Sequence, residues 1–285
     1  LDCEFVESGE DYVFRDPRAF ELACAELPAL AALGIDARAL DAAALSAAEP
    51  ALLPGMAGGV LFPDDAHFRP DSYCAELLRL VRQLGGIVEE GCEVLSLQAQ
   101  ADAIGHVETS KGLRRAPQVV LALASWSPAL VKGVGLQIPI QPGKGYSITY
   151  TLPAIVPKTP LVLTERSVCV TAWQDGYRLG STMEFSGFDD RLNAKRLAAL
   201  ERGAHEYLHE PFGDEVKERW FGWRPMTYDD LPLLGASPKH RNLFLATGHG
   251  MLGMSMSAIT GQLLAELLTG RNLSIDIAPF APGRF

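Results

Sequence analysis

Three glycines in the last fifth of the chain, Gly248, Gly250 and Gly253, have the spacing G-x-G-x-x-G. They follow an apolar segment at 243–247 and precede a segment with helical spacing that runs from about 254 to 269. A glycine loop between a strand and a helix lets a ligand approach the backbone, and the N–H groups at the start of the helix attract an anion or an electron-rich ring edge. The spacing therefore predicts a loop that contacts a cofactor.

Two other interpretations of this loop stay open. The first is a minimal NAD-binding fold, in which Asp276 would bind the ribose, although the residues beyond the helix are too few for the further strands that such a fold needs. The second is a glycine-rich turn that serves packing alone. The small residues Ala258, Gly261 and Ala265 recur on one face of the helix and predict that it packs close to a neighbour.

A second candidate for chemistry is Arg224, which stands between Trp223 and Pro225. An arginine in apolar surroundings needs an anionic partner, and its planar guanidinium matches the geometry of a carboxylate. Asp229 and Asp230 follow closely in the sequence and are candidates for a structural ion pair. No nucleophile–base pair is apparent elsewhere in the sequence.

The elements that must position these residues indicate a mixed α/β fold. An amphipathic helix is predicted at 71–84, and the apolar segment 118–124 predicts a strand in the middle of a sheet that is covered on both faces. A helix followed by such a strand is typical of α/β proteins. Residues 128–218 are β-rich and broken by proline and glycine, which predicts an antiparallel meander, and an amphipathic helix is predicted within this range at 191–208.

Composition excludes several classes of protein. The chain has 25 basic and 35 acidic residues, a net charge of −10, which argues against a nucleic-acid partner. No apolar segment approaches the roughly 20 residues of a membrane span. The 5 cysteines are odd in number and widely spaced, so no metal site is predicted, and reduced thiols in a cytoplasmic protein are expected.

Five segments together resemble the FAD-dependent amino-acid oxidoreductases, a family that includes D-amino-acid dehydrogenases and oxidases and glycine oxidase. The most specific is GWRPMTYDDLPLLG at 222–235, followed by NLFLATGHG at 242–250. The others are GVLFPDDAH at 59–67, VVLALASWS at 119–127 and PGKGYS at 142–147. The resemblance extends over nearly the whole chain.

The resemblance implies two domains. An FAD-binding, Rossmann-like domain would comprise 71–130 and 219–285, and a mainly antiparallel substrate domain would comprise 1–70 and 131–218. The family's first βαβ unit, whose own glycine motif cradles the FAD pyrophosphate, has no counterpart in this sequence. We therefore expect that a preceding segment or a partner chain supplies it, or that the chain is a truncated, non-catalytic flavin-fold module.

The resemblance also implies a reaction. FAD would accept hydride from the α-carbon of an amino acid, in the D configuration, and the resulting imine would hydrolyse to a 2-oxo acid. The electron acceptor would be a quinone or oxygen, and the protein would be cytoplasmic or peripheral to the inner face of a membrane. Such a reaction requires positioning and an unprotonated amine rather than a strong protein base.

The implied site residues fall into two groups. Arg224 would clamp the substrate carboxylate, Tyr146 would hydrogen-bond the bound acid or belong to the core, and His249 would face the flavin or substrate or serve only the shape of the loop. Ala124 replaces a glycine of the family pattern, and its methyl group is expected to crowd the flavin. The residues expected to contact FAD are Val94, Ala124, Trp126, Gly222, Gly248, Gly250, Met251, Leu252, Gly253, Met254 and Ser255.

Overall fold

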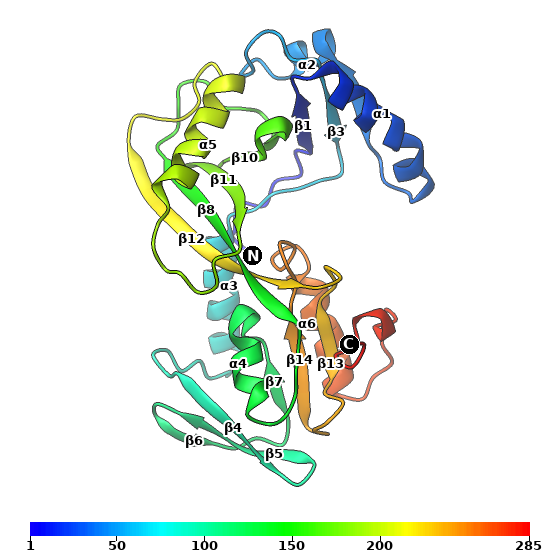
Figure 1. The fold of residues 1–285 in the computed structure, drawn as a ribbon, viewed down its shortest axis with the longest axis vertical. Coiled ribbons are helices and arrows are strands. Elements are labelled where there is room, and N and C mark those ends of the chain that lie inside the picture. Colours follow the sequence, from blue (N-terminus) through cyan, green and yellow to red (C-terminus); the bar gives the residue numbers. More distant parts are fainter. The chain divides into compact units, whose positions relative to one another are not determined.

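The computed structural model describes residues 1–285, which divide into two compact units (Figure 1). Unit 1 contains residues 1–87, 145–183 and 190–221, and unit 2 contains residues 88–144, 184–189 and 222–285. The division differs from the predicted domains mainly at two places. Residues 71–87 belong to unit 1, and residues 131–144 belong to unit 2, where Val131, Val134, Leu136 and Ile138 join the hydrophobic core.

The main sheet has eight strands in the order β12-β8-β11-β10-β9-β1-β3-β2. The predicted antiparallel meander is confirmed, because β10 pairs antiparallel with both β9 and β11, whereas β1 pairs parallel with β9. The strands are β1 (Glu10–Phe14), β2 (Arg38–Asp41), β3 (Gly58–Phe62), β8 (Ile140–Tyr150), β9 (Leu161–Leu163), β10 (Val168–Ala172), β11 (Tyr177–Glu184) and β12 (Val216–Thr227).

Helices α2 (Ala42–Ala48) and α5 (Ala194–Tyr207) contribute to the core of unit 1. Each begins at a side-chain cap, since Asp41 accepts a hydrogen bond from the Ala44 amide at 2.8 Å and Asn193 accepts from the Lys195 amide at 3.1 Å. One stripe of α5 is buried against the sheet, with Leu200 fully covered. The sequence predicted the helix at α5.

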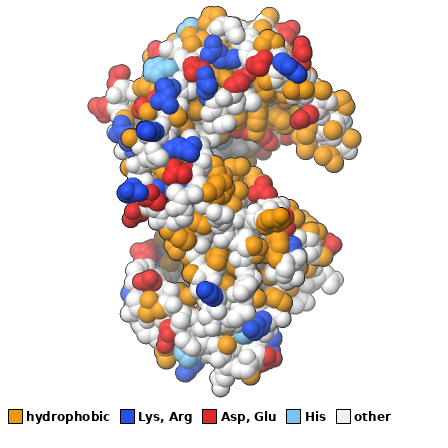
Figure 2. Space-filling model, in the orientation of Figure 1, with side chains coloured by type: hydrophobic (Ala, Val, Ile, Leu, Met, Phe, Trp, Pro, Cys, Tyr) orange, Lys and Arg blue, Asp and Glu red, His pale blue; other side chains and the backbone are white.

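Helix α1 (Pro17–Ala32) is apolar but has no buried residue. Its first turns pack at Phe20, whose ring lies where a side chain at Gly58 would stand. Leu22 is 63% exposed, and Leu33, just beyond the helix, is 77% exposed. Figure 2 shows hydrophobic side chains gathered over this helix.

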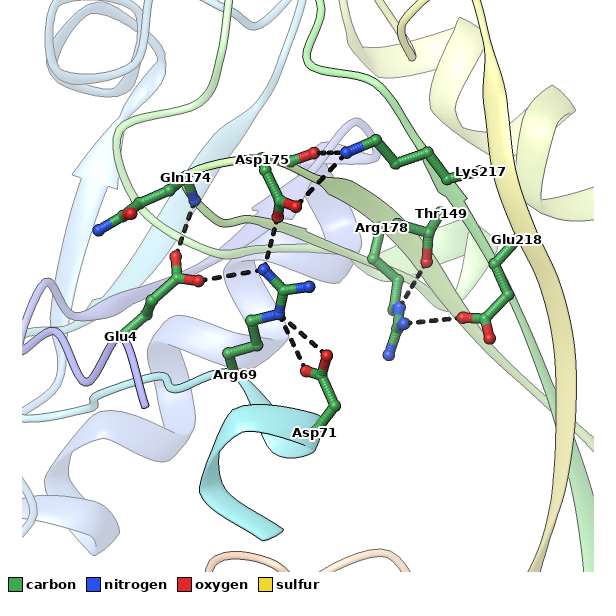
Figure 3. A network of polar contacts seen from close by, with 9 residues as sticks. All are labelled: Glu4, Arg69, Asp71, Thr149, Gln174, Asp175, Arg178, Lys217 and Glu218. Atoms are coloured by element: carbon green, nitrogen blue, oxygen red, sulfur yellow. Dashed lines mark hydrogen bonds and ion pairs between the residues drawn. The ribbon is translucent and has the colours of Figure 1, made fainter. Parts of the chain in front are cut away.

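Arg69, the residue before α3 (Pro70–Gln83), is the centre of a network of ion pairs in unit 1 (Figure 3). Its guanidinium contacts Glu4 at 3.2 Å, Asp71 at 3.0 Å and Asp175 in the β10–β11 turn. Lys217 of β12 donates a hydrogen bond to the carbonyl oxygen of Asp175. These carboxylates raise the pKa of Arg69, so the network stays charged and ties α3 to unit 1.

Unit 2 contains two three-stranded sheets, ordered β13-β14-β7 and β4-β5-β6. β14 pairs parallel with β7 and antiparallel with β13, so this sheet is mixed. The elements are β4 (Val94–Gln100), β5 (Ala103–Thr109), β6 (Gly112–Arg114), β7 (Val119–Leu121), α4 (Ser127–Lys132), β13 (Leu233–Ala236), β14 (Leu243–Thr247) and α6 (Ser257–Leu268). The predicted α/β fold class is confirmed.

One strand differs from its prediction. The segment 118–124 was expected in the middle of a sheet, but β7 is an edge strand, since it pairs only with β14, and Val120 is 38% exposed. It is also shorter than predicted, because the chain turns into the 3-10 helix Ala124–Trp126. The strand therefore has the composition of an interior strand and the position of an edge strand.

Replacing Arg69 by methionine is expected to lower the free energy of unfolding by about 1–3 kcal/mol, because partly buried Glu4 loses a charge-assisted hydrogen bond. The control is Arg79→Met, which removes an exposed helical pair with Glu76 at 2.9 Å and should lower the free energy of unfolding much less. Urea unfolding followed by circular dichroism measures both. Equal losses for the two variants would contradict the role assigned to Arg69.

Candidate functional site

The glycine loop lies between β14 and α6, as predicted, and its first two glycines are required by the fold itself. Gly248 has a φ of +76°, and a Cβ there would lie 2.7 Å from Thr227 Cγ2. Gly250 has a φ of +53°, and a Cβ there would lie 3.0 Å from Asp230 Oδ1. Left-handed backbone and close neighbours together select glycine at both positions.

Packing does not require the third glycine, and the helix starts later than predicted. A Cβ at Gly253 would meet only His249 Cβ, at an ordinary 3.5 Å, so close helix–strand packing does not require this glycine. Helix α6 begins at Ser257 rather than near Met254, because residues before it form turns. The small-residue face predicted to pack closely is exposed at Ala258, Gly261 and Ala265.

The turn after β7 contains the strained residue Ala124, which has a φ of +46°. The Thr247 hydroxyl donates a hydrogen bond to the carbonyl oxygen of Ala124 at 3.2 Å, and Ser127 Oγ lies 3.0 Å from the same hydroxyl. These buried groups hold the turn beside the end of β14. Glycine in the related family pattern would adopt this backbone without strain, which gives a backbone reason for that preference.

Two hydrogen bonds hold β12 on either side of Arg224. Ser125 Oγ donates to the carbonyl oxygen of Trp223 at 3.2 Å. The Gly250 amide donates to the carbonyl oxygen of Pro225 at 3.1 Å. The turn at 124–126, the predicted carboxylate clamp and the glycine loop are therefore brought together within unit 2.

An aromatic cluster reinforces the first of these contacts. The ring centroid of Trp126 lies 5.6 Å from that of Trp223, edge to face, and 6.0 Å from that of Phe188, stacked. Phe188 also meets Trp223 edge to face at 5.4 Å. Phe188 was not predicted as a site residue, because no periodicity or motif links residue 188 to either tryptophan.

The two aspartates proposed as partners of Arg224 have other contacts. Asp229 accepts two hydrogen bonds from Arg284, from Nε at 2.7 Å and from Nη2 at 2.9 Å. The Arg284 guanidinium lowers the pKa of Asp229 to about 2. Asp230 lies beside Gly250 in the turn that follows β12.

The other predicted site residues lie in different surroundings. Tyr146 belongs to β8 in unit 1, where its side chain is 2% exposed within the hydrophobic core. Val94 is the first residue of β4, in the second sheet of unit 2, and Gly222 lies in β12. His249 Nε2 lies 3.0 Å from Thr260 Oγ1, and burial lowers the pKa of its imidazole.

The remaining residues that are predicted to contact FAD differ in how far their side chains are exposed. Met251 is 63% exposed, Leu252 is 55% exposed and Trp126 is 52% exposed. Met254 and Ser255 lie in the turns before α6. Apolar groups gathered beside glycines on an open loop are typical of a surface that another apolar group covers.

Comparison with known proteins agrees with this architecture. The family model described as FAD dependent oxidoreductase matches residues 1–267. The chain belongs to this family.

Its relatives include D-amino acid dehydrogenases. That of Vibrio cholerae serotype O1 is 34% identical over 277 residues, which cover 94% of this chain and 65% of the relative. That of Chromohalobacter salexigens is 37% identical over 273 residues, which cover 93% of this chain and 64% of the relative. This member of the family thus spans about two thirds of the length of those relatives.

Glycine oxidase from Geobacillus kaustophilus has a similar structure. It superposes with a TM-score of 0.93 at 26% sequence identity, and the match covers 100% of this chain and 77% of the oxidase chain. No helix in the chain is both long and apolar enough to cross a membrane. No group of three or more histidine, cysteine or acidic side chains is arranged to hold a metal ion.

Replacing Ala124 by glycine is expected to raise the free energy of unfolding by up to about 1 kcal/mol, because the left-handed conformation costs a residue with a Cβ about 1–2 kcal/mol and the flexibility of glycine offsets part of the gain. In the control Ala129→Gly, within α4, the same exchange should lower the free energy of unfolding by about 1 kcal/mol. Thermal unfolding of the two variants gives opposite shifts if the strain at Ala124 is real. A loss of stability in both would show that it is not.

His249 is expected to titrate below the ordinary histidine value of 6.5. Its neutral form is favoured in the folded chain, so the unfolded state binds the proton more readily, and the free energy of unfolding falls as the pH drops from about 6.5 to the folded pKa. Above 6.5 this contribution is fully present. NMR titration of the His249 ring gives the pKa, and His249→Gln should remove that part of the pH dependence; a value of 6.5 or higher would refute the expectation.

Proposed function

We propose that the protein containing this chain is an FAD-dependent oxidoreductase that oxidises the α-carbon of an amino acid, in the D configuration. The product would be an imine that water converts to a 2-oxo acid and ammonia. The electron acceptor would be a quinone or oxygen. The resemblance to D-amino acid dehydrogenases along 94% of the chain supports the substrate class.

The observation that carries the proposal is the placement of Arg224. The residue before it is bound to the turn at 124–126, and the residue after it is bound to Gly250. Both of these segments are predicted to contact the flavin. A guanidinium between them would bind a carboxylate through two parallel hydrogen bonds and present the adjacent α-carbon to the cofactor.

The residues of unit 2 fit the flat, apolar ring of a flavin. The side chains of Trp126, Met251 and Leu252 are more than half exposed, and no side chain stands at Gly250 or Gly253. The left-handed φ of Gly250 excludes most other residues there without strain. The bound flavin would supply the hydride acceptor, while this chain would hold the substrate and keep the site apolar.

Two exposed faces favour an additional strand and helix in the complete protein. β7 has the apolar composition of an interior strand but pairs only with β14. The small-residue face of α6, at Ala258, Gly261 and Ala265, is also exposed. We infer that a βαβ unit, from another part of the protein or from a partner chain, pairs with β7 and completes the FAD site.

The proposed reaction does not need a strong base in the protein. His249 is held mostly neutral at pH 7 by burial and contacts Thr260. Because the His249 imidazole is neutral, the positive charge expected to bind the substrate carboxylate is that of Arg224. The amino group of the substrate must itself be unprotonated to react, so kcat/KM should rise with pH as that amine loses its proton.

In the active protein, Arg224→Lys is expected to raise KM for a D-amino acid by about 10- to 150-fold, since one charge-assisted hydrogen bond of about 1.5–3 kcal/mol is lost. The flavin absorbance spectrum should not change. Steady-state kinetics and an absorbance scan of the same preparation measure both quantities.

The matched control is Arg284→Lys, because Arg284 binds Asp229 rather than a substrate. This variant should lower the melting temperature and leave KM unchanged. If Arg224→Lys behaved like the control, Arg224 would be a structural residue. Turnover of L- but not D-amino acids by the unmodified protein would overturn the proposed substrate class.

A further inference from the structure

A cavity of about 400 Å³ lies at the end of β12 that follows Arg224. Its volume is at the lower end of the range for small-molecule sites, roughly 300–1,000 Å³. All of its lining residues belong to unit 2. They are Pro139, Ile140, Gln141, Phe185, Met226, Thr227 and Tyr228.

The cavity adjoins the predicted clamp because of strand geometry. Side chains alternate along a strand, so Arg224 and Met226 project from the same face of β12, on the order of 7 Å apart. Met226 lines the cavity. A molecule whose carboxylate is bound by Arg224 can therefore extend its other end toward this cavity.

The lining is apolar and partly uncovered. The side chain of Phe185 is 58% exposed and that of Tyr228 is 89% exposed. The hydroxyl of Thr227 already donates to the carbonyl oxygen of Leu231 at 2.8 Å. No charged residue lines the cavity, and its polar side chains are Gln141, Thr227 and Tyr228, so a charged group placed there would lose hydration without gaining an opposite charge.

Phe185 reaches this cavity from a short loop. Residues 184–189 belong to unit 2, although the residues on both sides of them in the chain belong to unit 1. In the same loop, Phe188 packs on Trp126 and Trp223 and so anchors the loop to β12. This anchoring fixes the loop beside β12, and Phe185 of the same loop lines the cavity.

We propose that this cavity binds the side chain of the amino-acid substrate, and that Phe185 and Met226 select apolar, unbranched or aromatic side chains over charged ones. The inference rests on the proposed function, because it takes Arg224 as the carboxylate clamp. It goes beyond that function because it assigns the side-chain specificity to Phe185 and Met226, which lie outside the glycine loop and are not the carboxylate clamp.

The test compares substrates of increasing length in the active protein: D-alanine, D-norvaline, D-norleucine and D-phenylalanine, with D-glutamate and D-lysine as charged competitors. Each added methylene should raise kcat/KM by about fourfold, the value of one buried CH₂. Phe185→Ser and Met226→Gln should flatten this series.

A second measurement is independent of turnover. Calorimetry with propanoate and hexanoate, which carry no amine to oxidise, should show tighter binding of the longer acid, and Phe185→Ser should abolish the difference. The matched control is Phe5→Ser, since Phe5 is 57% exposed and belongs to unit 1. It should leave both the substrate series and the carboxylate series unchanged.

The outcomes separate this inference from the proposed function. A length dependence that both variants abolish and the control retains supports it. A series that is flat in the unmodified protein, or unaffected by Phe185→Ser and Met226→Gln, overturns it, while a raised KM in Arg224→Lys would leave the proposed function standing. If Arg224→Lys changes neither KM nor carboxylate affinity, the clamp and this use of the cavity fail together.

Discussion

Two hydrogen bonds to β12, one to the residue before Arg224 and one to the residue after it, join the parts of unit 2 that carry its chemistry. A strand has little freedom once the carbonyls on both sides of a residue are held, so the direction of the intervening side chain is set by its backbone. The donors are Ser125 in the turn after β7 and Gly250 in the loop after β14. A shift of either segment would therefore move the guanidinium as well.

The same turns carry unusual backbone. Gly248 and Gly250 adopt left-handed conformations, and Ala124 does so with a β-carbon. Strain of this kind persists only where neighbouring contacts hold it, and here the Thr247 hydroxyl binds the Ala124 carbonyl. The tight turns bring the ends of β7 and β14 beside β12, which a more relaxed connection would not do.

The surfaces of unit 2 follow from this arrangement. Loops that expose glycine backbone also expose the apolar side chains around them, as at Met251 and Leu252. Beyond Arg224, the same strand continues into an apolar cavity that contains no charged group. Along β12, Arg224 is thus followed by an apolar cavity, an order of charge and apolar surface that is complementary to the carboxylate and the apolar side chain of an amino acid.

The sequence by itself determined the local elements. Helical spacing predicted α3 and α5, and the glycine spacing predicted the loop between β14 and α6, because helix periodicity and left-handed turns depend on neighbours a few residues away. The family pattern at 222–250 was also readable from the sequence, since its residues are consecutive.

Only the tertiary structure decided which segments meet. That Ser125 binds Trp223, that Phe188 packs on Trp126 and that Asp229 pairs with Arg284 are contacts between residues far apart in the chain, and no periodicity records them. The edge position of β7 and the later start of α6 also depend on contacts between distant segments. Pairing and packing between distant segments depend on where the whole chain places its backbone, whereas a sequence pattern reports only which side chains a short segment offers.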